Sequence, residues 1–206
     1  MLSKKFLDRL DLKNIIADLS RIDFEFPIFV DEKEVLKKFG LHRKKYILFN
    51  RAVDELKPFH PKLWSLKKYS ELTKKIKDHF DYSLVQIGND DFYGNIDNVD
   101  LNLLGKTNFE ELKVLLKNSL ILVTCEGGLV HLNHSLKGKS VVLFGPTDKR
   151  YFGYEENINI EGKGCQYKCF DSALLWREGC ILGHNPPKCI ESISVKDVFD
   201  ELSSFL

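Results

Sequence analysis

The segment that most constrains the fold is TCEGGLVHLNHSLKGKSVVLFGPTD, residues 124–148. It follows a short β-branched and apolar run, residues 121–123, which is typical of a buried parallel strand. A Gly127-Gly128 turn comes next, then an expected helix over residues 129–136 and a second buried strand over residues 140–144. A glycine turn that opens a helix presents backbone N–H groups to an anion, and the helix dipole adds to the attraction. The segment therefore predicts a phosphate-binding corner of a doubly wound α/β domain, at the carboxyl ends of its strands.

The rest of the chain from Tyr46 onward alternates strands with helices. Further strands are expected over residues 46–50, 83–87, 99–103 and 158–160, and helices over residues 66–80, 107–118 and 195–205. Thr107 and Glu110 have the spacing of a capping box, and Ser194 is expected to cap the last helix. This alternation predicts an α/β fold with a parallel sheet and right-handed crossovers.

The N-terminal residues 1–45 are predicted to form a helical segment and linker ahead of one domain, residues 46–206. The first helix would present one apolar face, made by Leu7, Leu10, Ile15, Ile16 and Leu19. A short helix over residues 31–39 is expected after the extended residues 26–29. Two interpretations stay open for this segment, an edge helix with its linker or an element that docks onto a missing partner domain.

Composition excludes several classes of protein. A net charge of +1 gives no electrostatic basis for nucleic-acid binding. No apolar run approaches the roughly 20 residues of a membrane span, and residues 1–12 lack the apolar region of a signal peptide. We therefore predict a cytoplasmic protein, with peripheral membrane association left open. In that reducing compartment the five cysteines, an odd number, argue against a disulfide framework.

Two turns resemble those of glycosyltransferase family 9, the lipopolysaccharide heptosyltransferases. The family carries D-[ST]-G-[LP]-x-H-L and then F/Y-G-P-T-D, and here residues 126–132 read EGGLVHL and residues 144–148 read FGPTD. The second match is complete. In the first, Glu126 replaces the aspartate, which moves the carboxylate out by one methylene, and Gly127 replaces the Ser/Thr, which removes a hydroxyl.

The resemblance implies the Rossmann-like, donor-binding C-terminal domain of a GT-B enzyme. Its reaction would be inverting transfer of a heptose or related sugar, without a catalytic metal, from a nucleoside-diphosphate donor to a saccharide or protein hydroxyl. ADP-heptose is the favoured donor, and lipopolysaccharide or surface glycan synthesis the favoured process.

The resemblance also assigns roles to side chains near the strand ends. Lys62 and Trp64 match the family's K-x-W-P, with Ser65 in place of proline, so Lys62 would contact the diphosphate and stabilise the leaving group. Trp64 is expected to pack its helix onto the sheet. Glu126 would bind the sugar hydroxyls, while the backbone N–H groups of Gly127 and Gly128 would bind the diphosphate.

Six further residues are candidates for donor binding: Asn50, Arg51, Asp90, Lys106, Thr107 and His131. Asn50 and Arg51 end the first strand, where Arg51 would reach a phosphate. Asp90 follows another strand and would accept the ribose hydroxyls, with Asp91 as an alternative, or else it would serve only the turn chemistry of its loop. Lys106 and Thr107 belong to a G-K-T turn near the base, with Thr107 expected mainly as a helix cap. His131 is interpreted either as a packed residue or as a donor contact, and His134 as surface.

A second strong pattern is the C-x3-C-x10-C-x8-C cluster of Cys165, Cys169, Cys180 and Cys189, within a finger over residues 164–190. Four thiolates at this density suit a structural tetrahedral metal, zinc by default or iron, and His184 is an alternative ligand. Free thiols and disulfides stay open as alternatives. Cys125 is expected as a small buried apolar residue.

Family 9 enzymes have a second, acceptor-binding domain that carries an aspartate as general base. The resemblance covers about residues 46–206, and the residues before them are too few for that domain. We therefore expect a fragment, a truncated product or half of a two-chain enzyme, inactive alone. Two alternatives remain, a non-catalytic module that binds a nucleotide or a partner, and another GT-B-like nucleotide-sugar enzyme such as an epimerase.

Overall fold

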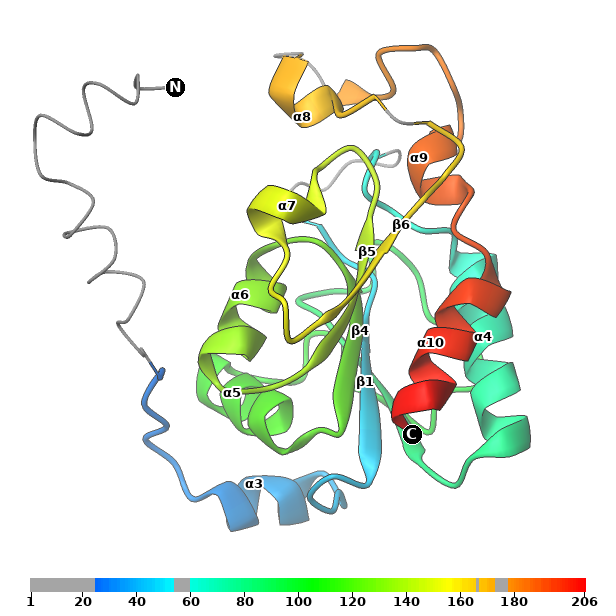
Figure 1. Cartoon of the computed structure of the whole chain (residues 1–206). Coiled ribbons are helices and arrows are strands. Elements are labelled where there is room, and N and C mark those ends of the chain that lie inside the picture. The colour runs from blue at the N-terminus through cyan, green and yellow to red at the C-terminus, as the bar shows by residue number, and fades with distance from the viewer. Residues whose placement is uncertain (1–24, 54–59, 166, 173–177) are drawn as a thin grey trace, which may run out of the picture.

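The fold is a single parallel sheet between two layers of helices (Figure 1). It is taken from a computed structural model of the chain, which describes residues 25–53, 60–165, 167–172 and 178–206. The strand order is β3-β2-β1-β4-β5-β6, and every pair of neighbours is parallel. The strands are β1 (Tyr46–Asn50), β2 (Ser83–Ile87), β3 (Leu101–Asn102), β4 (Ile121–Cys125), β5 (Ser140–Phe144) and β6 (Ile158–Glu161). The predicted doubly wound α/β fold is confirmed.

Helices cover the two faces of the sheet because alternate strand residues point to opposite sides. Ile47 and Phe49 of β1 face α4 (Leu66–His79) and α10 (Val195–Phe205). On the other side, Tyr46 and Leu48 pack in a second apolar cluster with residues of α5 (Phe109–Asn118). α3 (Glu32–Lys38) and α6 (Gly128–Ser135) complete that layer. Every residue of β1, β4 and β5 is buried, as expected for strands covered on both faces.

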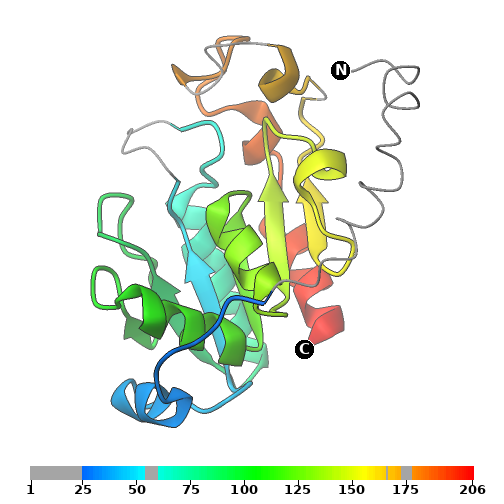
Figure 2. The ribbon, with the colours of Figure 1, turned by 90° about the vertical axis from the view of Figure 1, so that its left-hand side faces the viewer.

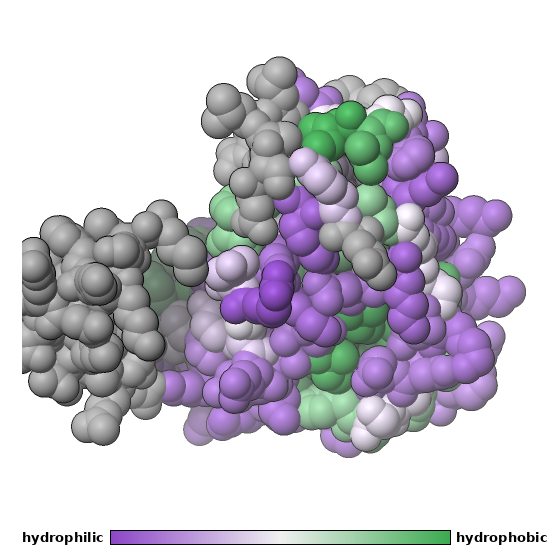
Figure 3. All heavy atoms as spheres, turned by 45° about the horizontal axis from the view of Figure 1, so that its top comes forward, coloured by the Kyte–Doolittle hydropathy of each residue, from purple (hydrophilic) through white to green (hydrophobic). Residues whose placement is uncertain are grey.

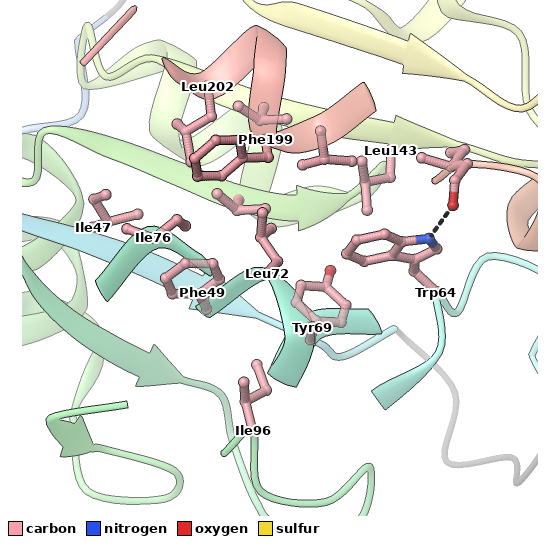
Figure 4. Packing of buried hydrophobic residues seen from close by; sticks show 14 of the residues in the cluster. Ile47, Phe49, Trp64, Tyr69, Leu72, Ile76, Ile96, Leu143, Phe199 and Leu202 are labelled. Atoms are coloured by element: carbon pink, nitrogen blue, oxygen red, sulfur yellow. Dashed lines mark hydrogen bonds between the residues drawn. The ribbon is translucent and has the colours of Figure 1, made fainter. Parts of the chain in front are cut away.

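Trp64 anchors the core cluster on the α4 face (Figure 4). Its side chain is fully buried, stacks edge-on against Tyr69, and donates from Nε1 to the carbonyl of Ile193 at 2.9 Å. The hydrogen bond ties the segment before α4 to the segment before α10. The prediction that Trp64 packs its helix onto the sheet is confirmed.

The N-terminal part described by the structure joins the helix layer opposite α4. Asp31 caps α3 by accepting hydrogen bonds from the N–H groups of Lys33 and Glu34, and Val35 buries the apolar side of the helix. Residues of α3 contact α5. The predicted short helix is confirmed, whereas the predicted helix around residues 7–19 lies outside the described residues.

The predicted cap of α5 is wrong by one residue. Asn108, not Thr107, is the N-cap, and it forms a reciprocal capping box with Glu111. The sequence contains both spacings, but Glu110 pairs instead with Lys113 at 2.7 Å and accepts from the N–H of Phe29. The strand expected over residues 99–103 is also shorter, since β3 is confined to Leu101–Asn102.

Three short helices lie beyond the carboxyl ends of the strands: α7 (Lys149–Phe152), α8 (Cys169–Ser172) and α9 (Lys188–Glu191) (Figure 2). Viewed toward this end, the molecule presents a largely polar surface with a few small apolar groups (Figure 3). Gly162 permits close packing here, because a Cβ at that position would lie 1.5 Å from the carbonyl oxygen of Cys189. Of the helices that the structure describes, none has the length and apolar character needed to cross a bilayer.

Candidate functional site

A cavity of about 550 Å³ opens at the carboxyl ends of β1 and β4. The connections run in opposite directions from these two neighbouring strands, so the cavity lies at the topological switch point where ligands bind in open α/β sheets. Its lining includes seven of the residues predicted from the sequence, Asn50, Lys62, Thr107, Glu126, Gly127, Gly128 and His131. The fold therefore brings together residues that lie far apart along the chain.

Asn50 joins three strand ends beneath the cavity. Its side-chain amide donates to the carbonyl of Ile87 at 3.1 Å, and its Oδ1 accepts from Thr124 Oγ1 at 3.2 Å. Oδ1 also accepts from the N–H of Ala52 at 3.3 Å. These bonds use both ends of a side chain that is 7% exposed. Asn50 therefore holds the ends of β1, β2 and β4 in register, whatever it also contributes to a ligand.

The central feature of the cavity is an ion pair between Lys62 and Glu126. Lys62 Nζ lies 2.7 Å from Glu126 Oε2, and the two side chains are 12% and 6% exposed. The side chain of Glu126, one methylene longer than an aspartate, extends from the end of β4 to the turn before α4. An ammonium and a carboxylate so close and so little solvated interact strongly, because the surroundings screen them less than water does.

Three contacts hold the turn that carries Lys62. The backbone N–H of Lys62 donates to Nδ1 of the buried His60 at 3.2 Å. Trp64 anchors the far side of the turn in the core. Gly145, in the FGPTD turn, packs against it so closely that a Cβ would lie 3.1 Å from the carbonyl oxygen of Pro61. The second family-like turn thus supports the position of Lys62.

The N-terminus of α6 faces the cavity through Gly127 and Gly128. Gly127 is the N-cap and contributes no side-chain hydrogen bond to the helix. A Cβ at either glycine would meet no atom within 4 Å, so the space above both positions is open. Uncapped backbone N–H groups beside open space form an anion-binding arrangement.

Arg51, Asp90 and Lys106 lie outside the cavity lining. Arg51 donates to the carbonyls of Trp64, at 3.0 Å, and of Tyr93. Asp90 accepts from the N–H of Phe92 at 2.9 Å, the turn contact that was the alternative interpretation for this residue. Lys106 donates to the carbonyl of Asn102 at 2.9 Å. In this structure all three side chains bind backbone of their own loops or of neighbouring loops.

Five apolar side chains of the cavity lining, called here the apolar wall, were not predicted as site residues. They are those of Val53, Phe109, Leu112, Leu129 and Phe152. Phe109 begins α5 and is 54% exposed, which is unusual for so large an apolar side chain. The sequence signal for Phe109 is its position directly after Asn108, the cap of α5, because the first residue of a helix need not pack in the core. Such a wall suits a flat, weakly polar group next to the charged pair.

Cys125 and Tyr69 lie under the charged pair and are uncharged at neutral pH. Burial raises the pKa of the Cys125 thiol, and burial raises the pKa of the fully buried Tyr69 well above its ordinary range. Tyr69 donates to the carbonyl of Asn50 at 3.1 Å. The expectation that Cys125 is a small buried residue is confirmed, and a neutral buried thiol is a poor nucleophile.

His131 lies at the cavity and contacts Tyr154. Its Nδ1 is 2.8 Å from the Tyr154 hydroxyl, and its own side chain is exposed. The ring of His134 stacks on Tyr154 with centroids 3.6 Å apart and planes 13° apart. His134 is half-buried, because the loop after α7 covers one face of its ring.

The FGPTD turn ends in a buried carboxylate. Asp148 caps α7 by accepting from the N–H of Arg150 at 2.8 Å. The Arg150 guanidinium also donates to it from Nε and Nη2, and these hydrogen bonds lower the pKa of Asp148 to about 2. Asp148 is 2% exposed. Its role in the fold is to fix the turn beside the cavity.

The other three cysteines of the predicted metal finger are close enough to Cys189 to affect the pKa of its thiol. Cys169 and Cys189 are buried and Cys165 and Cys180 half-buried, and none forms a disulfide. Burial, and then the neighbouring thiols, raise the pKa of Cys189 to about 11. Within the described residues no group of three or more ligating side chains is arranged to hold a metal ion. The metal finger therefore stays a prediction.

Fold and site together define an α/β protein of the Rossmann-like class with a charged cleft at its switch point. Residues 24–173 match the sequence profile of glycosyltransferase family 9 (heptosyltransferase). The chain belongs to this family. No protein of curated function matches the sequence.

Solved structures show the same fold at low sequence identity. E. coli ADP-heptose lipopolysaccharide heptosyltransferase II is 19% identical with a TM-score of 0.60, over 84% of this chain and 50% of that one. A family 9 glycosyltransferase from Veillonella parvula is 16% identical with a TM-score of 0.62, over 88% and 53%. The iron-containing dodecameric glycosyltransferase TibC from E. coli is 17% identical with a TM-score of 0.64, over 80% and 47%. The chain thus spans about half the length of these structures.

Proposed function

We propose that this chain binds the nucleoside-diphosphate sugar donor of a glycosyl transfer. The observation that supports this most is the Lys62–Glu126 ion pair at the switch-point cavity, beside the open N-terminus of α6. The pair places a cation and a carboxylate within one small site. A nucleoside-diphosphate sugar carries matching groups, an anionic diphosphate and, next to it, the hydroxyls of the sugar.

In the proposed complex, each group of the site has one task. Lys62 and the backbone N–H groups of Gly127 and Gly128 bind the diphosphate and stabilise the charge that grows on it as the sugar leaves. Glu126 accepts hydrogen bonds from the sugar hydroxyls. The acceptor oxygen attacks the anomeric carbon from the opposite face as the bond to the diphosphate breaks, which inverts the configuration. The positive charge needed at the leaving group comes from the protein, so the proposed reaction uses no catalytic metal.

The proposed donor is ADP-heptose, transferred to a saccharide or protein hydroxyl in surface glycan synthesis in the cytoplasm. Two similar structures support this choice, since E. coli WaaC was determined with ADP and TibC with ADP-D-β-D-heptose. The apolar wall that includes Phe109 and Leu129 offers a surface for the nucleobase. Base and sugar identity rest on this similarity together with the shape of the cavity.

In the proposed scheme, the general base of the reaction comes from outside this cavity. The chain spans about half of each similar structure, and no carboxylate of the cavity lining other than Glu126 is present among the described residues. We propose that an acceptor-binding domain, in the same protein or in a partner chain, supplies this base. Cavity and acceptor would then meet at the carboxyl ends of the strands.

A second function, nucleotide binding without catalysis, is favoured by two observations. Glu126 and Gly127 depart from the family pattern, and Glu126 neutralises Lys62. A module of this kind would bind the nucleotide but not discriminate between sugars.

The test is calorimetric titration of the chain with ADP, GDP and UDP, and with the matching nucleosides. We expect saturable binding of one diphosphate. Lys62→Ala should weaken it about 10- to 100-fold, since a hydrogen bond to a charged group contributes about 1.5–3 kcal/mol, and should change nucleoside binding little. The matched control is Lys67→Ala, because the Lys67 side chain on α4 is 87% exposed.

The outcomes separate the two functions. If donor sugars bind more tightly than the diphosphate alone, the transferase proposal is supported. Equal affinities for diphosphate and diphosphate sugar would favour the module that only binds nucleotide. Equal losses of diphosphate and nucleoside binding in Lys62→Ala would contradict the role given to Lys62, provided that the melting curve shows a folded variant.

A further inference from the structure

His131 is held by an aromatic group that the proposed function does not use. The imidazole comes from α6, and Tyr154 comes from the loop that follows α7. Their rings meet edge to face, with centroids 5.6 Å apart and planes at 77°. The Tyr154 hydroxyl lies 2.8 Å from Nδ1 of His131, a normal length for an O–H···N hydrogen bond.

A second contact, with His134, orients the plane of the Tyr154 ring. His134, one turn further along α6, stacks on it at 3.6 Å with planes 13° apart. The phenol is therefore held by two histidines of one helix, with one at its hydroxyl and one on its face. This arrangement restricts the rotation of Tyr154, so its hydroxyl stays directed at Nδ1 of His131.

The direction of this hydrogen bond depends on the tautomer of His131, because a neutral phenol can donate or accept. Partial burial raises the pKa of Tyr154, so the phenol keeps its proton at neutral pH. A neutral imidazole has one donor and one acceptor nitrogen, and a hydrogen bond at one nitrogen selects the tautomer. If the phenol donates to Nδ1, the ring proton must lie on Nε2.

We propose that Tyr154 is a positioning residue that holds His131 as the Nε2–H tautomer. His131 lines the cavity, and Nε2 is the ring nitrogen that remains for a ligand once Nδ1 contacts Tyr154. His131 then offers an N–H donor, not an acceptor, to an oxygen of the bound diphosphate sugar. The ligand part of this proposal rests on the proposed function, whereas the tautomer does not.

The first experiment measures the tautomer in the ligand-free protein. Long-range ¹H–¹⁵N correlation spectra distinguish Nε2–H from Nδ1–H imidazoles, and His131→Gln assigns the signal. We expect the Nε2–H pattern in the wild type and a mixed pattern in Tyr154→Phe, which keeps the ring but lacks the hydroxyl. Tyr151→Phe is the matched control, since Tyr151 lies on α7 and is 65% exposed.

An Nδ1–H pattern in the wild type would overturn the proposal, and so would an unchanged pattern in Tyr154→Phe. A merely structural tyrosine would change the melting temperature without changing the tautomer of His131.

The second experiment measures ADP and adenosine binding by the same variants. Tyr154→Phe should weaken ADP binding about 3- to 10-fold, because a neutral hydrogen bond contributes about 0.5–1.5 kcal/mol, and should leave adenosine binding unchanged. A shifted tautomer with unchanged ADP affinity would overturn the ligand contact. If the folded wild type does not bind ADP, the proposed function and the contact between His131 and the diphosphate are both contradicted. The spectra would still decide the tautomer of His131.

Discussion

Glu126→Gln gives the most direct test of how the charged pair works. Glu126 Oε2 lies 2.7 Å from Lys62 Nζ and neutralises its charge, so a diphosphate must compete with this carboxylate for the ammonium. Glutamine has nearly the same size but carries no charge. We therefore expect Glu126→Gln to bind ADP more tightly than the wild type does.

The expected size follows from the geometry of the pair. Two unit charges 2.7 Å apart interact by about 6 kcal/mol at an effective dielectric constant of 20, before desolvation is subtracted. Most of this is offset, since burying both charges is itself unfavourable. A net competition of about 1.4 kcal/mol would tighten ADP binding about tenfold. The free energy of unfolding should fall by about 1–3 kcal/mol, less than for a fully buried pair because Lys62 is 12% exposed.

The assay is titration with ADP and with an ADP-sugar, alongside urea unfolding of the same samples. The ADP-sugar should bind more weakly to Glu126→Gln than to the wild type, because Glu126 is the proposed acceptor for the sugar hydroxyls. Glu71→Gln is the matched control, since Glu71 is 51% exposed and lies 3.8 Å from Lys67. It should change neither affinity by more than about twofold, as exposed pairs contribute at most about 1 kcal/mol.

Weaker or unchanged ADP binding by Glu126→Gln, relative to Glu71→Gln, would refute the idea that the carboxylate competes for Lys62. If Glu126→Gln binds both ADP and the ADP-sugar more tightly, the competition of Glu126 for Lys62 is supported. The proposed contact between Glu126 and the sugar hydroxyls is then contradicted.

Three further predictions concern the start of α6, the FGPTD turn and the cysteine cluster. Gly127→Ser should raise the free energy of unfolding by a few tenths of a kcal/mol, because serine can cap α6 and its Cβ meets open space; a loss above about 0.5 kcal/mol in urea unfolding would contradict this. The pKa of Asp148 is lowered from 3.8 to about 2, so its carboxylate stabilises the fold above pH 4, and this contribution disappears as the pH falls toward 2. We expect the contribution to be about 1 kcal/mol, half of what the shift alone implies, because the Arg150 side chain is 75% exposed. The free energy of unfolding of the wild type, measured from pH 6 to 2, should show this loss, and that of Asp148→Asn should not. If the two proteins lose stability in parallel as the pH falls, the contribution of Asp148 is contradicted. Finally, if the cysteines hold a metal, elemental analysis should find about one zinc or iron per chain and much less in Cys189→Ser. A metal-free wild type with reactive thiols would instead support free cysteines.

The order and type of the main elements could be predicted because they follow from local patterns. Apolar runs such as residues 121–123 indicate buried strands, and Ser194 with Asp197 marks the start of α10. Prediction failed where two local signals competed. Thr107 and Asn108 both have a glutamate three residues later, and the cap went to Asn108 because Glu110 binds Lys113 and the backbone of Phe29.

The candidate site was predicted in its residue types but not in its contacts. Lys62 and the two glycines were found from family-like turns, and the structure places them at one cavity. Arg51 was expected at a phosphate, yet it binds the carbonyls of Trp64 and Tyr93. A long guanidinium side chain can reach either way, and sequence spacing does not say which backbone groups lie near it.

The parallel α/β sheet and the glycine turn that opens α6 follow from the sequence, because periodicity and turn chemistry act over a few residues. The pairing of Glu126 with Lys62 and the contact of Tyr154 with His131 depend on the assembled fold. These partners lie on different elements, and strand order and helix packing set the distance between them. Contacts of this kind have no local signal, so they emerge only when the sheet is assembled.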